Sequence, residues 1–191
     1  MDRREALKAV SLILGYSLTG TSALVLLNGC KAESNTDWAP NFFSEAEIKL
    51  IAEVAEIILP KTDTPGAKDA MCERYVDEAV FLFYKKEDQQ KFKKDLTVFD
   101  DYAKNKFSKA FMALNQNEKE KILEIVVKNM LKNEKDQKNK SHIFKKLKEL
   151  TISGYCTSEV GTKGGLLEYR PVPGPYQGCI DYISVGKTWA L

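Results

Sequence analysis

The chain has 191 residues, of which 29 are lysine or arginine and 27 are aspartate or glutamate, so its formal net charge is only +2. A near-neutral balance without a clustered basic excess argues against a nucleic-acid-binding protein. A single histidine argues against a Ser/His/Asp or Cys/His catalytic constellation and against a histidine-rich metal site. We therefore expect no catalytic, cofactor-binding or metal-binding residues in this chain.

The N-terminal segment predicts a signal peptide. Arg3 and Arg4 are adjacent in a charged start similar to the twin-arginine export consensus, and residues 9–27 carry no charge. The sequence Leu-Asn-Gly-Cys ending at Cys30 resembles a lipoprotein cleavage box, so we expect a lipid on Cys30. A Sec signal with two chance arginines and a permanent transmembrane anchor are the alternatives. The sequence thus predicts an exported, periplasmic protein anchored to the membrane by lipid.

The length after cleavage is about 160 residues, which is typical of one domain. Without the three basic and two acidic residues of the signal, 26 basic and 25 acidic residues remain. The expected organisation is a signal peptide over residues 1–29, a linker over 30–42 and a helical domain over 43–191.

Three cysteines remain once Cys30 carries lipid, and an odd number outside the cytoplasm suggests one disulfide and one other thiol. Cys156 and Cys179 flank a loop-rich stretch and form the natural pair. Cys72 lies in a helical pattern and could be a small buried residue. A bridge from one of these cysteines to another subunit is the alternative.

The first helix of the domain is predicted within residues 41–60. Ser44 with Glu47 three residues later is a capping box, and Phe43 with Ile48 is placed for a hydrophobic staple. The apolar positions that follow form a stripe wide enough for burial on more than one side. Pro60 ends the helix, because proline cannot continue the hydrogen-bond ladder.

A polar corner, LPKTDTPGA, follows this helix. Asp63 could cap the next turn, Pro65 would fix the backbone, and Gly66 would allow a positive φ. A lysine, two threonines and a nearby helix start also make an anion site conceivable. The structural corner is the favoured interpretation.

Four more helices are predicted from apolar residues at helical spacing, within residues 67–86, 87–107, 117–133 and 141–155. In the first of them, Tyr75, Ala79, Leu82 and Phe83 fall near one apolar face. The lone His142 begins the last helix, where it is expected to lie in the cap region. No alternating strand pattern precedes residue 150. The predicted fold class is all-α, a compact bundle of about five helices.

The C-terminal segment is predicted to be long, irregular and rich in glycine, proline and tyrosine from Gly154 onward. Its four tyrosines (Tyr155, Tyr169, Tyr176 and Tyr182) argue against disorder, because aromatic side chains seek contacts. The segment could wrap its own bundle or lie against a partner.

Three stretches carry a family resemblance: residues 43–80 with the corner, LKELTISGYCTSEVG, and YRPVPGPYQGC. Together they resemble the gluconate 2-dehydrogenase subunit 3 family over residues 43–182. The positions that match the family motif, or that are candidates for a partner interface, are Pro60, Thr62, Asp63, Pro65, Gly66, Ala67, Gly154, Tyr155, Tyr169, Gly174, Tyr176 and Gly178.

The resemblance implies a non-catalytic small subunit whose partner is a large FAD-binding dehydrogenase of the glucose-methanol-choline type, acting on a sugar hydroxyl. It implies FAD in the partner, no cofactor in this chain, and in some complexes a multihaem cytochrome c subunit. Twin-arginine export moves folded proteins, so this chain could carry a flavin-loaded partner across the membrane. The alternative is a standalone exported lipoprotein that acts as a binding or structural module.

Overall fold

The computed structural model describes residues 38–135, 142–172, 174–175 and 178–190. The chain divides into a unit of Met1–Ala39 and a unit of Pro40–Leu191, and the second is described below. The predicted signal peptide with Arg3 and Arg4, the lipidation site Cys30, and Tyr176 lie outside the described residues. Most of the predicted linker lies outside them as well.

Helix α3, Glu45–Ile58, begins with the predicted capping box. The Ser44 backbone N–H donates to the Glu47 carboxylate at 2.8 Å, and the Glu47 backbone N–H donates to the Ser44 hydroxyl at 3.4 Å. Phe43 and Ile48 are both buried, as a hydrophobic staple requires. The helix ends with Leu59 as its C-cap, one residue before Pro60. The predicted start and end of this helix are confirmed.

Helix α4, Cys72–Phe83, holds the chain just before α3 through a buried carboxylate. Asp77 is fully buried and accepts backbone N–H groups from Asn41, Phe42 and Phe43 at 2.6, 3.1 and 2.9 Å. Hydrogen bonds to a charged acceptor are stronger than neutral ones, and they satisfy a charge that would be costly to bury alone. The start of the domain is therefore fixed on α4.

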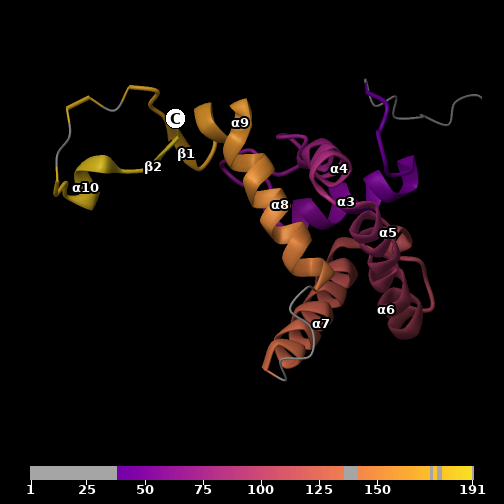
Figure 1. Ribbon diagram of the computed structural model, residues 1–191. Helices are drawn as coiled ribbons and strands as arrows, with labels where there is room; N and C mark the ends of the chain where they lie inside the picture. The colour runs from indigo at the N-terminus through magenta and orange to yellow at the C-terminus, as the bar shows by residue number, and fades with distance from the viewer. Residues whose placement is uncertain (1–37, 136–141, 173, 176–177, 191) are drawn as a thin grey trace, which may run out of the picture. The chain divides into compact units, whose positions relative to one another are not determined.

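Helix α8, Ile143–Thr157, packs along α4 in the antiparallel sense (Figure 1). The Lys146 ammonium lies 5.5 Å from the Tyr84 ring centre at the end of α4, and Gly154 lies against Tyr75 near its start. A Cβ on Gly154 would lie 2.9 Å from the Tyr75 side chain, so glycine permits the close approach. The helix continues past Gly154 to Thr157, so the irregular segment predicted from Gly154 begins later in the chain. The glycine itself serves the packing of α8 on α4.

The remaining body consists of helices joined by short connections. The predicted helix over 87–107 is two helices in the structure. At the boundary the Thr97 hydroxyl donates to the Lys94 carbonyl at 3.0 Å, a side-chain bond to the backbone of the kind that disturbs a continuous helix. The elements are α5 Lys86–Asp95, α6 Thr97–Phe107, the 3₁₀ turn η1 Phe111–Ala113 and α7 Gln116–Lys135. The all-α fold class is confirmed.

The apolar face predicted for α4 is only partly buried. Ala79 is buried, whereas Leu82 is 64% exposed and Phe83 is 79% exposed. Phe81, the residue before them, is 46% exposed. Periodicity places apolar residues on a face, but burial also needs a neighbouring element along the full length of that face. The last turn of α4 instead presents three consecutive apolar side chains to solvent.

The C-terminal segment contains short regular elements. These are α9 Glu159–Lys163, β1 Leu167–Tyr169, α10 Tyr182–Val185 and β2 Thr188–Ala190. Strands β1 and β2 pair in parallel, with Glu168 opposite Trp189. The Arg170 guanidinium lies 4.5 Å from the Trp189 ring centre, and the Lys187 ammonium donates to the Gly165 carbonyl at 3.2 Å. Among the described residues, none of the helices has the length and hydropathy to span a bilayer.

Candidate functional site

The corner between α3 and α4 is organised by the carboxylate of Glu56. One Glu56 oxygen accepts the Lys61 backbone N–H at 3.0 Å, and the other accepts the Lys68 backbone N–H at 2.9 Å. The Ala67 N–H donates to the Leu59 carbonyl at 2.9 Å and closes the loop across its base. Because one side chain binds both arms of the loop, the direction of the chain between the helices is fixed.

Gly66 is needed in this corner because the backbone passes close to Glu56. A Cβ on Gly66 would lie 2.5 Å from Glu56 Oε1 and 2.7 Å from the Lys61 backbone nitrogen. The predicted positive φ is wrong for Gly66, since the positive-φ glycines among the described residues are Gly174 and Gly186. The conformation with positive φ occurs instead at Met71, directly before α4.

The capping role predicted for Asp63 is filled by another carboxylate. Asp63 is exposed, whereas Asp69 accepts the Gly66 backbone N–H at 3.0 Å and forms an ion pair with the Lys61 ammonium at 3.1 Å. Lys61, the main cation of the conceivable anion site, is thus paired with Asp69. These contacts favour the structural corner over an anion site.

Tyr155 connects the corner to α8. Its ring is buried against Ala55, Ala67, Ala70 and Cys72, and its hydroxyl donates to the Pro65 carbonyl at 2.8 Å. Burial raises the pKa of Tyr155, so the hydroxyl stays protonated and remains a donor. Two of the three stretches that carry the family resemblance therefore meet at one hydrogen bond.

Cys72 belongs to the same buried cluster as Tyr155, and its thiol is protected from reaction. It is fully buried, and burial, followed by the nearby charges of Glu73 and Glu56, raises its pKa to about 12. The pKa of Glu73 is also raised, mainly by burial, and its Oε2 atom is buried without a hydrogen-bond partner. A thiol in such surroundings is not a nucleophile near neutral pH.

The three cysteines that the structure describes are free. Cys156 is half-buried and Cys179 is exposed, so the pair predicted within the chain is not formed in this structure. The exposed thiol of Cys179 is open to a link with another molecule. The alternative of a bridge to another subunit stays a prediction.

Glu53 joins the corner to α7. Its carboxylate forms ion pairs with Lys68 of the corner and with Lys119 of α7, the latter at 2.8 Å. Burial alone would raise the pKa of Glu53, but the hydrogen bonds and charges of the two lysines outweigh it and lower the pKa. Lys119 is itself buried, so the pair is shielded from solvent and contributes to packing between distant parts of the chain.

The outer side of the corner is exposed. Pro60, Lys61, Thr62 and Asp63 face solvent, whereas Gly66 and Ala67 are buried. The motif positions outside the corner that the structure describes are likewise either buried or exposed. Gly154 and Tyr155 are buried, while Tyr169, Gly174 and Gly178 are exposed in the C-terminal segment. The corner therefore has an inner side used for folding and an outer tip that is open to contact.

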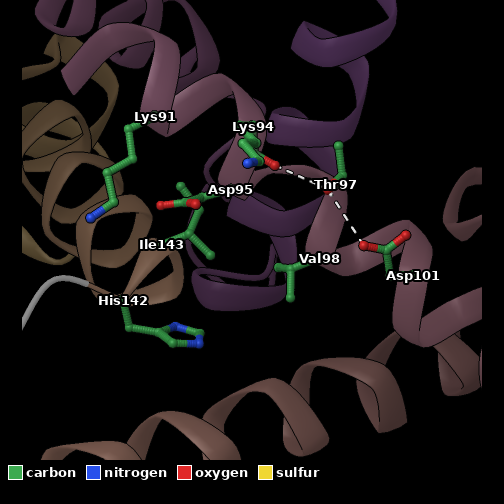
Figure 2. Close-up of a pocket in the computed structure, with 8 residues that line it drawn as sticks. All are labelled: Lys91, Lys94, Asp95, Thr97, Val98, Asp101, His142 and Ile143. Atoms are coloured by element: carbon green, nitrogen blue, oxygen red, sulfur yellow. Dashed lines mark hydrogen bonds between the residues drawn. The ribbon is translucent and has the colours of Figure 1, made fainter. Parts of the chain in front are cut away.

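A second feature is an open cavity of about 290 Å³ where α5 and α6 approach the start of α8 (Figure 2). Its charged lining is mixed, with Lys91 and Lys94 opposed by Asp95 and Asp101. His142 reaches this cavity, but its Nδ1 accepts the Phe144 backbone N–H at 3.2 Å, so the predicted cap role is confirmed. Within the described residues, no cluster of three or more His, Cys, Asp or Glu side chains is arranged to hold a metal ion.

A comparison with models of protein families shows to which family the chain belongs. The family model described as gluconate 2-dehydrogenase subunit 3 matches residues 45–174, from the first residue of α3 into the C-terminal segment. The chain belongs to this family. The assignment makes the chain a relative of an accessory subunit of a dehydrogenase complex and implies association with other subunits. No curated protein and no solved structure matches the chain significantly.

The family match includes the corner and its exposed outer tip. The matched region contains Glu56, Gly66 and Tyr155, whose contacts build the corner. Glu56 and Asp69 were not identified as important from the sequence. No fixed spacing reveals Glu56, because it binds N–H groups five and twelve residues away.

Proposed function

We propose that the chain is the non-catalytic small subunit of a membrane-associated, FAD-dependent sugar dehydrogenase of the glucose-methanol-choline type. The family match over residues 45–174 carries this proposal. It is supported by the corner, where Glu56, Gly66 and Tyr155 are engaged in internal contacts that build the fold. In this proposal FAD and the oxidation belong to the large subunit.

The small subunit would stabilise, escort and tether its partner. Its N-terminal sequence resembles a twin-arginine signal, a pathway that moves folded proteins, and flavin must be inserted before the large subunit crosses the membrane. Lipid on Cys30 would then anchor the complex at the periplasmic side, where electrons pass to a cytochrome c subunit. The exposed tip at Thr62 and Asp63 is the part of the corner available to the partner.

Co-purification tests the complex directly. The full chain with a C-terminal affinity tag is solubilised from membranes of its own cells, and the purified fraction is scanned for flavin absorbance. We expect an equimolar large subunit with a flavin spectrum and sugar-dependent dye reduction. Recovery of the chain alone and colourless would contradict the proposal and favour a standalone lipoprotein.

The exposed tip can be tested in the same experiment. Asp63→Arg reverses a charge on the outer side of the corner, and Asp88→Arg makes the same reversal on the exposed face of α5. We expect Asp63→Arg to lower the flavin recovered per small subunit and Asp88→Arg to leave it unchanged. Equal recovery for both variants would place the partner surface elsewhere on the chain.

Export is tested by changing Arg3 and Arg4 to lysine together. If the small subunit escorts its partner through the twin-arginine route, the double variant leaves the flavoprotein and its activity in the cytoplasm. Normal periplasmic activity of the dehydrogenase in this variant would contradict the escort role. Cys30→Ala separates the tether from export, because we expect it to release an active complex from the membrane fraction.

A further inference from the structure

The exposed end of α4 has the features of a membrane-contacting element. Phe81, Leu82 and Phe83 are consecutive and 46%, 64% and 79% exposed. A contiguous apolar patch on an otherwise polar surface marks contact with another protein or with lipid. Lys85 and Lys86 follow after Tyr84 and are exposed. Lysine side chains beside apolar anchors suit an interface, since their stems lie along the apolar region while their ammonium groups reach phosphates.

The end of α4 is held in place by the side chain of Gln89. The Gln89 side-chain nitrogen, which carries two hydrogens, lies within hydrogen-bond distance of the carbonyls of Val80, Phe81 and Tyr84, at 3.1, 2.9 and 3.2 Å. Carbonyls at the end of a helix otherwise rely on water, and an unsatisfied one is costly in a bilayer. Gln89 therefore keeps the three apolar side chains on an ordered helix end.

The path of the chain brings the predicted tether to the same helix. The segment Asn41–Phe43 is bound by Asp77, and Phe81 lies four residues further along α4, one turn away on the same face. Pro40 lies ten positions after Cys30, and a chain of this length spans at most ~36 Å when it is fully extended. A lipid on Cys30 would keep Pro40 within this distance of the bilayer surface, and Asp77 binds the residues that follow Pro40 to α4.

We propose that Phe81, Leu82 and Phe83 insert into the interface of the bilayer to which Cys30 is tethered. This inference rests on the proposed function, because it requires the exported, lipid-bearing chain. The occupant is the lipid surface: the tether supplies proximity, and the ammonium groups of Lys85 and Lys86, beside the apolar residues, can reach headgroup phosphates, while the exposed carboxylates of Glu87 and Asp88 follow in the first turn of α5. The contact would give the folded body one orientation on the membrane, which a single tether alone cannot do.

Fluorescence quenching by lipid tests the insertion. The full lipid-bearing chain, with Trp38 and Trp189 replaced by phenylalanine, is reconstituted into phosphatidylethanolamine and phosphatidylglycerol vesicles that carry bromine on their acyl chains. Phe83→Trp reports the end of α4. Leu131→Trp, which replaces a 49% exposed apolar residue of α7, is the matched control. We expect the first variant to lose most of its fluorescence relative to unbrominated vesicles and the control to keep most of it.

Three other outcomes overturn the proposal, and a fourth distinguishes its failure from that of the proposed function. Equal quenching of the two variants would mean that α4 has no special contact with lipid. Unquenched Phe83→Trp, combined with loss of flavin recovery in a Leu82→Glu/Phe83→Glu variant, would identify a protein interface instead. If none of the variants were recovered with the vesicles, the predicted lipid tether would be contradicted. Quenching without a co-purifying flavoprotein would instead contradict the dehydrogenase partnership and leave the lipid contact established.

Discussion

The Tyr155 hydroxyl donates a hydrogen bond to the Pro65 carbonyl at 2.8 Å, across 90 residues of sequence. Pro65 lies in the corner after α3, and Tyr155 lies near the end of α8. Gly161 and Gly165 both lie so close to Tyr155 that a side chain on either would collide with it. The corner and the end of α8 thus form one packed unit, although they are far apart in the chain.

Removal of this hydroxyl should destabilise the fold without disturbing the ring. Tyr155→Phe leaves the Pro65 carbonyl, which is partly buried, without its donor, and we expect a loss of about 1–2 kcal/mol in the free energy of unfolding. Urea denaturation of the purified mature chain measures the difference. Tyr169→Phe removes a hydroxyl from a 49% exposed residue and should change nothing measurable. Equal stability of all three proteins would show that the bond to Pro65 contributes little.

A side chain at position 66 should be poorly tolerated. In Gly66→Ala the new Cβ would lie 2.7 Å from the Lys61 backbone nitrogen and even closer to Glu56, whose carboxylate is held by two N–H groups. Overpacking of this kind costs about 1–3 kcal/mol. Gly164→Ala is the matched control, because its Cβ would meet its nearest atoms at 3.6 and 4.0 Å. A similar urea midpoint for both variants would contradict the close-packing role of Gly66.

The parts of the fold that follow from local chemistry could be predicted from the sequence. The capping box of Ser44 and Glu47 joins residues three apart, and Pro60 acts on its immediate neighbours, so both ends of α3 are visible in the sequence. The division of α5 from α6 was missed because it depends on how one hydroxyl, that of Thr97, is used. The exposure of Leu82 and Phe83 was missed because periodicity carries no information about the length of the neighbouring element.

The chemistry of the corner was only partly predictable. Its rigidity followed from the two prolines and Gly66, but the carboxylates that organise it are Glu56 and Asp69, with Asp63 exposed. The choice among three nearby carboxylates depends on the path of the loop, which also contacts Tyr155 of a distant helix. For Asp77 a signal did exist, because an aspartate between Val76 and Ala79 on an apolar face requires buried donors.

The cysteines should differ widely in reactivity. Cys72 is fully buried with a pKa raised to about 12 by burial and by neighbouring carboxylates, whereas Cys179 is exposed. We expect iodoacetamide at pH 8 to modify Cys179 of the native chain quickly and Cys72 only in denaturant, since the thiolate is the reactive form. Peptide mass spectrometry after timed quenching assigns each site. Rapid modification of Cys72 in the native chain would contradict its buried environment.

The Asp77 carboxylate should be essential for the order of the segment before α3. Asp77→Ala leaves three backbone N–H groups of residues 41–43 without their acceptor, and we expect a loss of about 3 kcal/mol or more in the free energy of unfolding. Hydrogen exchange of the Asn41, Phe42 and Phe43 amides should accelerate more than that of the amides within α7. Asp101→Ala, on the exposed face of α6, serves as the control. Unchanged protection at residues 41–43 would rule out this anchoring role.

Stability should fall in acid through Glu53. Its pKa lies below the usual value of 4.5 because the hydrogen bonds and charges of Lys119 and Lys68 outweigh the opposing effect of burial. The folded state therefore binds the proton less readily than the unfolded state does. The stabilisation is complete above pH 4.5 and is lost as the pH falls through the lower pKa of the folded chain.

Glu53→Gln isolates this effect. We expect the variant to be less stable than the wild type at pH 7, and the difference between them to shrink as the pH falls below 4.5, because the wild type loses the same ion pairs there. Urea unfolding in steps from pH 7 to pH 3 measures the two slopes. Glu120→Gln removes one exposed carboxylate of α7 and should retain the wild-type slope. A constant difference between wild type and Glu53→Gln over the whole range would mean that the charge of Glu53 does not stabilise the contact between the corner and α7.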